Sequence, residues 1–326
     1  MIIMRITALI VTYKRFGELF KCIGAINAQM DAKVAEIGIW DNDPESFFMS
    51  AFRNAEFTVE NRPHADEGTR LYRITKQDSV SINYYVHSNN IGMAGALNRL
   101  MNIYSGQSND FLWVMDDDGI PDSMCLFNLL KWSSKYQYLS PLVMDITGKD
   151  ILSFALNKTK KPSDIINCAQ NGIYLGHANP WNGLLLSTEL VRKIGLPIKE
   201  YFIWGEEVEY QLRAAQITEI ATCVDAIFYH PQERIVYKDK FCGVGFIEPE
   251  DLKRRAVFFC NQTHIFKKYN KTALVFFLLR YSFYYVLMKK LDIRNYVFFV
   301  KCYMSALLEN RRIELVDNIQ ARLPSA

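Results

Sequence analysis

The first 120 residues contain four apolar runs, and a polar loop follows each of them. The runs span residues 6–11, 34–40, 81–87 and 111–115, and apolar residues at helical spacing follow the first and third. Continuous apolar runs that alternate with helices are typical of buried strands in a parallel α/β sheet. Because the carboxyl ends of parallel strands meet at one edge of a sheet, we expect the four polar loops to lie close together.

The pattern is weaker in the stretches around these runs. Residues 44–80 are polar and have no clear period, which indicates a surface excursion between the second and third strands. Shorter strands are expected at 139–144 and 184–187. A short helix over 187–196 follows, with Ser187 or Thr188 as its cap and Gly195 and Pro197 at its end.

Three consecutive aspartates, Asp116, Asp117 and Asp118, directly follow the fourth apolar run. Adjacent carboxylates repel one another, so each keeps its charge at low cost only when it is solvated, paired or bound to a cation. One interpretation is an oxygen-ligand site for Mg²⁺ or Mn²⁺ that carries a diphosphate. The other is a solvated acidic turn before a helix, with Asp122 and Ser123 as caps.

A second acidic cluster follows Gly205. If a helix begins there, Glu206 and Glu207 lie in its first turn, where the helix dipole favours carboxylates. These two side chains point about 100° apart, whereas Glu209 shares a face with Glu206 and with Arg213. One glutamate would then enter a cleft as a base while Glu209 pairs with Arg213. The alternative is a well-capped helix and nothing more.

A further strand, residues 226–229, ends on His230. A single histidine is more often a satisfied core or surface group than a metal ligand. His230 nevertheless terminates a strand as the aspartates do, and a neutral imidazole is a suitable ligand for Mn²⁺. The residues alone leave both interpretations open.

Composition indicates a folded body followed by a region of different character. The chain is 50% apolar, which argues against disorder. Residues 251–301 hold eleven Lys/Arg and two Asp, a net charge of +9, and residues 302–326 balance, so the first 250 residues carry −6. The seven cysteines are scattered without a CxxC pair, which favours free thiols in a reducing cytosol.

The basic region after residue 250 is also rich in aromatic residues. Its longest apolar stretch, 273–288, contains Arg280 and is short for a membrane span, which needs about 20 residues. This combination favours helices that lie in a membrane interface near anionic lipid. The alternative is a helical cap on the domain whose basic face is exposed to solvent, or a dimer contact.

As a set, these segments resemble family 2 glycosyltransferases over roughly residues 5–235. Within that family the chain is most similar to the galactofuranosyltransferase and rhamnosyltransferase branch, bacterial enzymes that build surface glycans. The matching segments are IVTYKR (10–15), WDN (40–42), NNIGMAG (89–95), WVMDDD (113–118), WNG (181–183), WGEEVEY (204–210) and His230.

The resemblance implies a GT-A fold, which is a Rossmann-like αβα sandwich with a mostly parallel sheet. It implies that Asp116 and Asp118 bind Mn²⁺ or Mg²⁺ as a DXD-type motif, with His230 as the third protein ligand. The residues implied to hold the donor are Thr12, Tyr13, Arg15, Asp41, Asn90, Gly92 and Asp117. Those implied to hold the acceptor sugar are Trp181, Asn182 and Trp204.

Glu207 resembles the family's catalytic base, which deprotonates the acceptor hydroxyl for one in-line displacement with inversion. This chain has Glu206 and Glu207 where the branch usually has two aspartates. The carboxylate therefore reaches one methylene further, and which of the two glutamates acts stays open.

The implied function is metal-dependent inverting transfer of a sugar, best galactofuranose from UDP-galactofuranose, to a lipid-linked glycan in the synthesis of cell-surface polysaccharide such as O-antigen. A dTDP-rhamnose-dependent rhamnosyltransferase is the alternative. A non-catalytic subunit that binds a nucleotide sugar or glycan is the alternative from another class. A nucleotidyltransferase or another phosphoryl-transfer enzyme would need a glycine-rich phosphate-binding loop, and the chain has no GxxxxGK[ST] motif. No recognised nucleic-acid module accompanies the basic region.

We therefore expect a GT-A domain over residues 1–250, with nucleotide-sugar binding in about 1–120 and the acceptor side in about 121–250. A basic, aromatic helical region is expected over 251–326. The expected location is the cytoplasm, peripheral on the inner face of the cell membrane, with an anionic membrane surface as a partner. A homo-oligomer is left open.

Overall fold

The computed structural model describes residues 4–45, 48–232, 239–241 and 243–308. The chain forms two compact units. The first comprises Met1–Pro197 and Arg213–Glu233, and the second comprises Ile198–Leu212 and Arg234–Ala326. The predicted boundary at residue 250 stays a prediction, and the part of the predicted C-terminal region after residue 308 lies outside the described residues.

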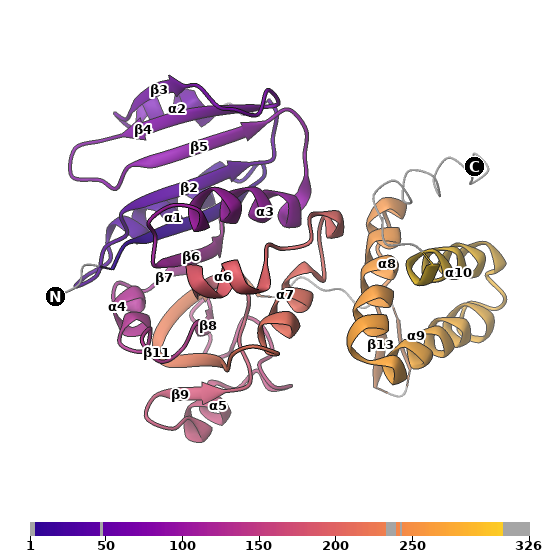
Figure 1. Cartoon of the computed structure of the whole chain (residues 1–326). Coiled ribbons are helices and arrows are strands. Elements are labelled where there is room, and N and C mark those ends of the chain that lie inside the picture. The colour runs from indigo at the N-terminus through magenta and orange to yellow at the C-terminus, as the bar shows by residue number, and fades with distance from the viewer. Residues whose placement is uncertain (1–3, 46–47, 233–238, 242, 309–326) are drawn as a thin grey trace. The chain divides into compact units, whose positions relative to one another are not determined.

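A mixed sheet forms the centre of the first unit, with helices flanking it (Figure 1). Within the described residues the sheet has eleven strands, and its main path runs β3-β4-β5-β2-β1-β6-β10-β8-β11-β7. The four apolar runs form parallel neighbours in this path: β1 Ile6–Thr12, β2 Glu36–Asp41, β5 Ile82–His87 and β6 Phe111–Asp116. The predicted α/β architecture is confirmed.

The other half of the sheet is built around one antiparallel strand. β10 Asn182–Ser187 lies antiparallel between β6 and β8 Tyr138–Asp145. β11 Ile220–His230 runs parallel to β8. Two short strands, β7 Ile120–Pro121 and β9 Ile173–Leu175, pair antiparallel with β11. The carboxyl ends of β6 and β11 thus carry the aspartates and the histidine.

Helices cover the sheet because their apolar residues recur at helical spacing. In α1 Phe16–Asn27, the residues Leu19, Cys22, Ile23 and Ile26 are all buried. The sequence also predicts the cap of α6 correctly, since the Ser187 side chain accepts a hydrogen bond from the Leu190 N–H. The remaining helices of this unit are α3 Gly92–Ser105, α4 Cys125–Leu130, α5 Pro162–Cys168 and α6 Thr188–Ile194.

The described part of residues 44–80 has more secondary structure than the surface excursion that its polarity predicts. They form α2 Phe48–Asn54 and a hairpin of β3 Thr58–Arg62 and β4 Thr69–Thr75. β4 pairs antiparallel with β5, so the hairpin extends the sheet. Phe48 and Phe52 anchor α2, because both side chains are buried against the ring of Tyr84. The prediction is wrong because this order comes from pairing and ring contacts outside the segment.

The second unit is mainly helical. It contains the 3₁₀ turn Lys199–Tyr201, most of α7 Glu206–Ala214, and the hairpin β12 Asp239–Phe241 with β13 Val244–Phe246. Helices α8 Leu252–Tyr269, α9 Lys271–Phe283 and α10 Ile293–Leu308 follow, and a π-helical turn, Tyr284–Met288, continues α9. The core of this unit is aromatic, with Phe259, Tyr281 and Phe299 in mutual ring contact.

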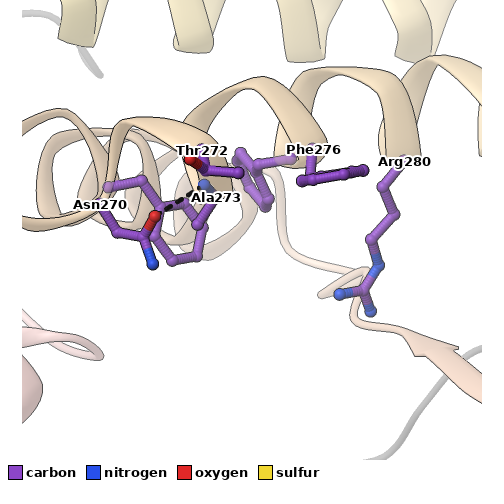
Figure 2. A pocket seen from close by; sticks show the side chains of 7 residues that line it. Asn270, Thr272, Ala273, Phe276 and Arg280 are labelled. Atoms are coloured by element: carbon purple, nitrogen blue, oxygen red, sulfur yellow. Dashed lines mark hydrogen bonds between the residues drawn. The ribbon is translucent and has the colours of Figure 1, made fainter.

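A hollow of about 370 Å³ lies beside α9 in the second unit (Figure 2). Phe266, Phe276 and Phe277 supply apolar walls, and Arg280 supplies a cation at one end. The hollow is therefore apolar with a positive rim.

Candidate active site

Asp116, Asp117 and Asp118 occupy the turn between β6 and β7. The turn is tight because β7 pairs at once with β11, with Ile120 opposite Tyr229. Gly119 permits this approach, since a Cβ atom at that position would lie 2.3 Å from Cζ of Phe228. The pairing brings the aspartates next to the carboxyl end of β11, where His230 is the last residue.

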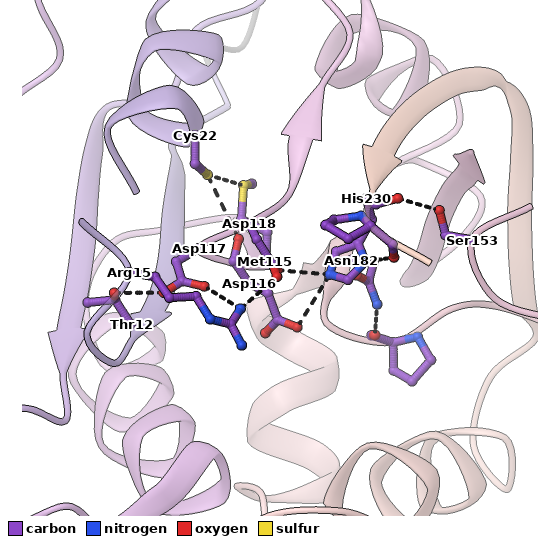
Figure 3. A network of polar contacts seen from close by, with 12 residues as sticks. Thr12, Arg15, Cys22, Met115, Asp116, Asp117, Asp118, Ser153, Asn182 and His230 are labelled. Atoms are coloured by element: carbon purple, nitrogen blue, oxygen red, sulfur yellow. Dashed lines mark hydrogen bonds and ion pairs between the residues drawn. The ribbon is translucent and has the colours of Figure 1, made fainter. Parts of the chain in front are cut away.

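Asp116, Asp118 and His230 converge, as the sequence predicts for metal ligands (Figure 3). His230 Nε2 lies 3.0 Å from Asp118 Oδ1 and 4.0 Å from Asp116 Oδ2. One potential ligand atom from each residue lies within 4.8 Å of the others. Asp118 and His230 are buried, and Asp116 is half-buried, so the group is open on one side.

The tautomer of His230 is fixed by the backbone. Nδ1 lies 2.6 Å from the carbonyl oxygen of Pro231, which can only accept, so Nδ1 carries the proton of the neutral ring. The lone pair is then on Nε2, the atom that faces the carboxylates. Nε2 lies 3.0 Å from Asp118 Oδ1 and is otherwise without a hydrogen-bond partner among the described residues.

This donor set fits a divalent cation. Two carboxylate oxygens and an imidazole nitrogen are ligands that Mn²⁺ accepts, and Mg²⁺ accepts the oxygens most readily. The hydrogen bond from Nδ1 to a backbone carbonyl is the usual second contact of a metal-binding histidine, because it orients the ring and fixes its tautomer. The half-buried Asp116 leaves room for the remaining ligands to come from a substrate or from water.

The aspartates are held in an environment that disfavours their charge. Burial raises the pKa of Asp116 to about 7, with Asp118 and Asp117 adding to the rise and His230 and Arg15 opposing it. Burial also raises the pKa of Asp117 to about 6 against the hydrogen bond from Thr12. The pKa of His230 is raised, since the two carboxylates outweigh the effect of burial. A cation would therefore replace protons that the site otherwise retains.

Asp117 points away from the metal-ligand group and toward β1. Its carboxylate accepts hydrogen bonds from Thr12 Oγ1 at 2.7 Å and from Arg15 Nη1 at 3.1 Å. The same Arg15 nitrogen lies 2.6 Å from Asp118 Oδ2. Asp117, Thr12 and Arg15, all predicted donor-binding residues, thus form one network that orients the aspartate turn. Tyr13 lies between Thr12 and Arg15 in sequence and is exposed.

Asp41 and Asn90 shape the neighbouring strand-end loops. Asp41 is fully buried and accepts hydrogen bonds from the Tyr84 hydroxyl and from the Asp43 N–H. Asn90 Oδ1 accepts from the N–H of Gly92, whose φ of +72° suits a residue without a side chain. In this structure both predicted donor-binding side chains therefore hold backbone in place.

The predicted acceptor residues of the first unit lie beside the aspartates. The carbonyl of Trp181 accepts the Asp116 N–H at 3.0 Å, and Asn182 pairs with Met115 in the sheet. Trp181 is only 3% exposed, so its ring offers no open face for stacking on a sugar. Asn182 donates to the Pro180 carbonyl, while its buried Oδ1 has no hydrogen-bond partner among the described residues.

The loop before α7 has an unusual backbone. Phe202, Trp204 and Gly205 have φ values of 59°, 64° and 103°. Asn261 of α8 stabilises this shape, because its Nδ2 lies 2.9, 3.1 and 2.8 Å from the carbonyl oxygens of Tyr201, Ile203 and Trp204. The third predicted acceptor residue, Trp204, is therefore held by its backbone, and its half-buried side chain packs on the core of the second unit.

Glu206 and Glu207 lie in the first turn of α7, as predicted, and Glu209 lies there too. Glu207 is half-buried, and its Oε2 accepts the Gly205 N–H at 2.8 Å. Glu206 is only 3% exposed. Glu209 is fully buried and accepts from Lys268 Nζ at 2.9 Å and from the Tyr269 hydroxyl at 2.8 Å. Exposure therefore favours Glu207 over Glu206 as the group that meets a substrate.

Two structural residues of the site were not predicted. Asn42 joins two strand-end loops, because it donates to the Gly92 carbonyl and accepts from the Ile91 N–H. Its position next to Asp41 at a strand end is a signal that could have identified it. Asn261 has a weaker signal, a buried amide within the aromatic run of α8.

The chain is similar in sequence to named galactofuranosyltransferases. No protein-family model matches the chain. The chain is 26% identical to galactofuranosyltransferase GlfT1 of Mycobacterium tuberculosis over 267 residues, which are 79% of this chain and 81% of that protein. It is also 26% identical to GlfT1 of Mycolicibacterium smegmatis over 239 residues, 69% of this chain and 70% of that protein.

Solved structures share the fold. GalNAc-T7, solved with UDP, GalNAc and Mn²⁺, superposes with a TM-score of 0.54 at 11% identity, over 81% of this chain and 48% of that one. S. aureus TarS 1–349 superposes with a TM-score of 0.52 at 10% identity, over 97% of this chain and 83% of that one. The chain is a glycosyltransferase with a GT-A fold.

The raised pKa of Asp116 predicts that any binding of a divalent cation at the aspartate cluster depends on pH. Asp116, with a pKa of about 7, must lose its proton to bind a cation. Without metal, its raised pKa gives stability that is lost as the pH rises through about 7. We expect Mn²⁺ to raise the Tm, measured by differential scanning fluorimetry, more at pH 8 than at pH 6.

Matched substitutions test this assignment. Asp116→Asn should remove most of the Mn²⁺-dependent rise in Tm, whereas Asp78→Asn, at an exposed position, should leave it unchanged. An equal rise in Tm in the wild type and Asp116→Asn would show that the cation binds elsewhere.

The glycosyltransferase should also depend on Asn261. Asn261→Ala leaves three carbonyl groups of the 201–204 loop without their shared donor, which costs about 1–3 kcal/mol when such groups are buried. We expect a lower urea midpoint and a turnover that falls even where the protein is fully folded. Gln262→Ala, on the next position of α8, serves as the control. Unchanged stability and turnover in Asn261→Ala would contradict the role given to its amide.

Proposed function

We propose that this glycosyltransferase moves a galactofuranosyl group from UDP-galactofuranose to a hydroxyl of a lipid-linked glycan, with Mn²⁺ or Mg²⁺ and with inversion. The observation that carries metal dependence is the convergence of Asp116, Asp118 and Nε2 of His230, whose lone pair faces the carboxylates. The named activity of the relatives, galactofuranosyl transfer, supports the choice of sugar. UDP is supported by the TarS structures with UDP and UDP-GlcNAc.

Asp116, Asp118 and His230 would hold the cation. When bound, the cation offsets the negative charge that develops on the departing diphosphate. Arg15 orients Asp117 and Asp118 through its two ion pairs. Thr12 fixes Asp117 on the opposite side. These residues therefore prepare an electrostatic site whose geometry does not have to reorganise during the reaction.

Glu207 is the proposed base. Its carboxylate takes the proton of the acceptor hydroxyl as the hydroxyl oxygen forms a bond to the anomeric carbon. The bond from that carbon to the diphosphate oxygen breaks in the same displacement, and UDP leaves with the electron pair. A single displacement from the opposite side inverts the anomeric configuration. The growing polysaccharide is proposed to carry its lipid in the membrane, with the enzyme on the cytoplasmic face.

The two glutamates can be separated by amide substitution. Glu207→Gln keeps the size of the side chain but cannot take a proton, so turnover should fall by about 10²–10⁴-fold. Binding of UDP, measured by calorimetry in the presence of Mn²⁺, should be retained. Glu219→Gln, on the exposed surface, is the control and should keep full activity. An active Glu207→Gln together with an inactive Glu206→Gln would assign the base to Glu206.

A donor screen tests the reaction itself. Purified protein is incubated with Mn²⁺, a synthetic lipid-linked acceptor, and either UDP-galactofuranose or dTDP-rhamnose, and the products are identified by mass spectrometry and by NMR of the new anomeric centre. We expect extension by galactofuranose with inversion, and loss of the product on addition of EDTA. Extension only by rhamnose would replace the proposed donor. Donor binding without any product would instead indicate a non-catalytic binding subunit.

A further inference from the structure

Several large apolar side chains of the second unit point to solvent along α9 and the turn that precedes α10. Six of them are between 56% and 66% exposed: Val275, Phe276, Leu279, Leu287, Leu291 and Ile293. We refer to these six residues as the apolar ridge. Scattered exposed apolar residues are normal on a protein surface, but six residues this exposed within 19 positions are a local concentration that favours an interaction site.

The apolar ridge belongs to a helix whose other side is packed. Phe277 and Tyr281 are buried in the aromatic core, whereas Val275, Phe276 and Leu279 lie on the opposite, exposed side of α9. The hollow beside Phe276 enlarges this side and is lined by further aromatic rings (Figure 2). The helix therefore has apolar residues on both sides, although only one side packs on described residues of the second unit.

The surroundings of the apolar ridge are strongly cationic. Residues 271–308 contain six Lys/Arg and a single carboxylate, Asp292. Asp292 caps α10, because it accepts from the N–H and the side chain of Asn295. Lys271, Lys290 and Arg294 are exposed next to ridge residues. A second copy of the chain would bring like charges together on this face, whereas an anionic surface would be attracted to it.

The contacts of α9 favour a helix that lies on a membrane over one that crosses it. By length and composition, one segment of the described chain, Lys271–Met288, is apolar enough to span a bilayer. Arg280 in its middle donates to the Gly245 carbonyl and lies 5.2 Å from the centre of the Phe246 ring. Tyr281 donates to the Ile247 carbonyl at 2.8 Å, and Tyr285 donates to Glu248 at 2.8 Å.

These bonds tie α9 and the π-helical turn after it to residues 245–248 of the same unit. Glu248 also pairs with Arg255 at 3.3 Å. A spanning helix would have to break these bonds and expose Arg280 to hydrocarbon, which has no groups to replace them. A helix at the interface keeps the bonds and buries only the apolar ridge.

We propose that α9 and the turn before α10 dock on the surface of a bilayer that contains anionic lipid. The apolar ridge enters the boundary between headgroups and acyl chains. Lys271, Lys290 and Arg294 lie at the level of the anionic headgroups. The proposal does not depend on the identity of the sugar donor, because docking requires neither donor nor acceptor.

Vesicle flotation with the full chain tests the proposal. The protein is mixed with phosphatidylcholine vesicles that either contain or lack phosphatidylglycerol. We expect binding to the anionic vesicles, weaker binding to the neutral ones, and release from the anionic ones as salt is raised. The double variant Phe276→Ser/Leu279→Ser should lower the partition coefficient by about tenfold or more. Lys290→Glu/Arg294→Glu should remove the preference for phosphatidylglycerol.

The matched control is Met30→Ser/Ile166→Ser, which changes two exposed apolar residues of the first unit and should leave flotation unchanged. Circular dichroism and turnover with a water-soluble acceptor show whether each variant is folded. Folded ridge variants that float like the wild type would overturn the proposal. So would protein that resists alkaline carbonate extraction from membranes, because that result indicates a spanning helix. A dimer that ignores vesicles and dissociates in Phe276→Ser/Leu279→Ser would assign the ridge to a second copy.

Discussion

The repulsion among three adjacent carboxylates is the constraint on which the site depends. Asp116, Asp117 and Asp118 follow one another in a single tight turn, where burial raises the pKa of the first two. Side chains from two other parts of the sheet offset this repulsion. Arg15, which follows β1, pairs with Asp117 and Asp118, and His230 at the end of β11 faces Asp116 and Asp118. Because those partners come from separate strands, the site exists only when the sheet has formed, and a cation would complete the compensation.

The sequence predicts the part of the site that depends on strand ends. Buried strands give continuous apolar runs, so the positions of β1, β2, β5 and β6 and the loops that follow them can be read from the pattern alone. The convergence of Asp116, Asp118 and His230 follows from the same rule. The directions in which the side chains point cannot be predicted from this rule. Asp117 turns toward Thr12 rather than toward open solvent, and Trp181 is buried, because both depend on which neighbour each strand finds in the sheet. The hairpin within residues 44–80 escapes prediction for that reason too.

In the second unit, the shape of the 201–204 loop depends on a residue that is distant in sequence, so no local sequence pattern predicts it. Three backbone carbonyl groups of the 201–204 loop accept hydrogen bonds from the side chain of Asn261, which lies 57 to 60 residues later in the chain. The loop leads directly into the first turn of α7, where Glu206 and Glu207 lie. Removing everything after residue 250 would therefore remove the donor that shapes this loop together with α9. A truncation cannot distinguish docking from loop support, whereas surface substitutions on the apolar ridge can.

Helices α8 and α9 of the second unit have different roles. The inner side of α8 contributes Asn261 to the loop and Lys268 to the buried Glu209, so it stabilises the turn that carries the proposed base. The outer side of α9 carries the apolar ridge. Because both belong to one compact unit, docking of the ridge would fix the height of Glu207 relative to the bilayer without any change of conformation within that unit. If Glu207 is the base, such docking would favour acceptor hydroxyls at one distance from the lipid.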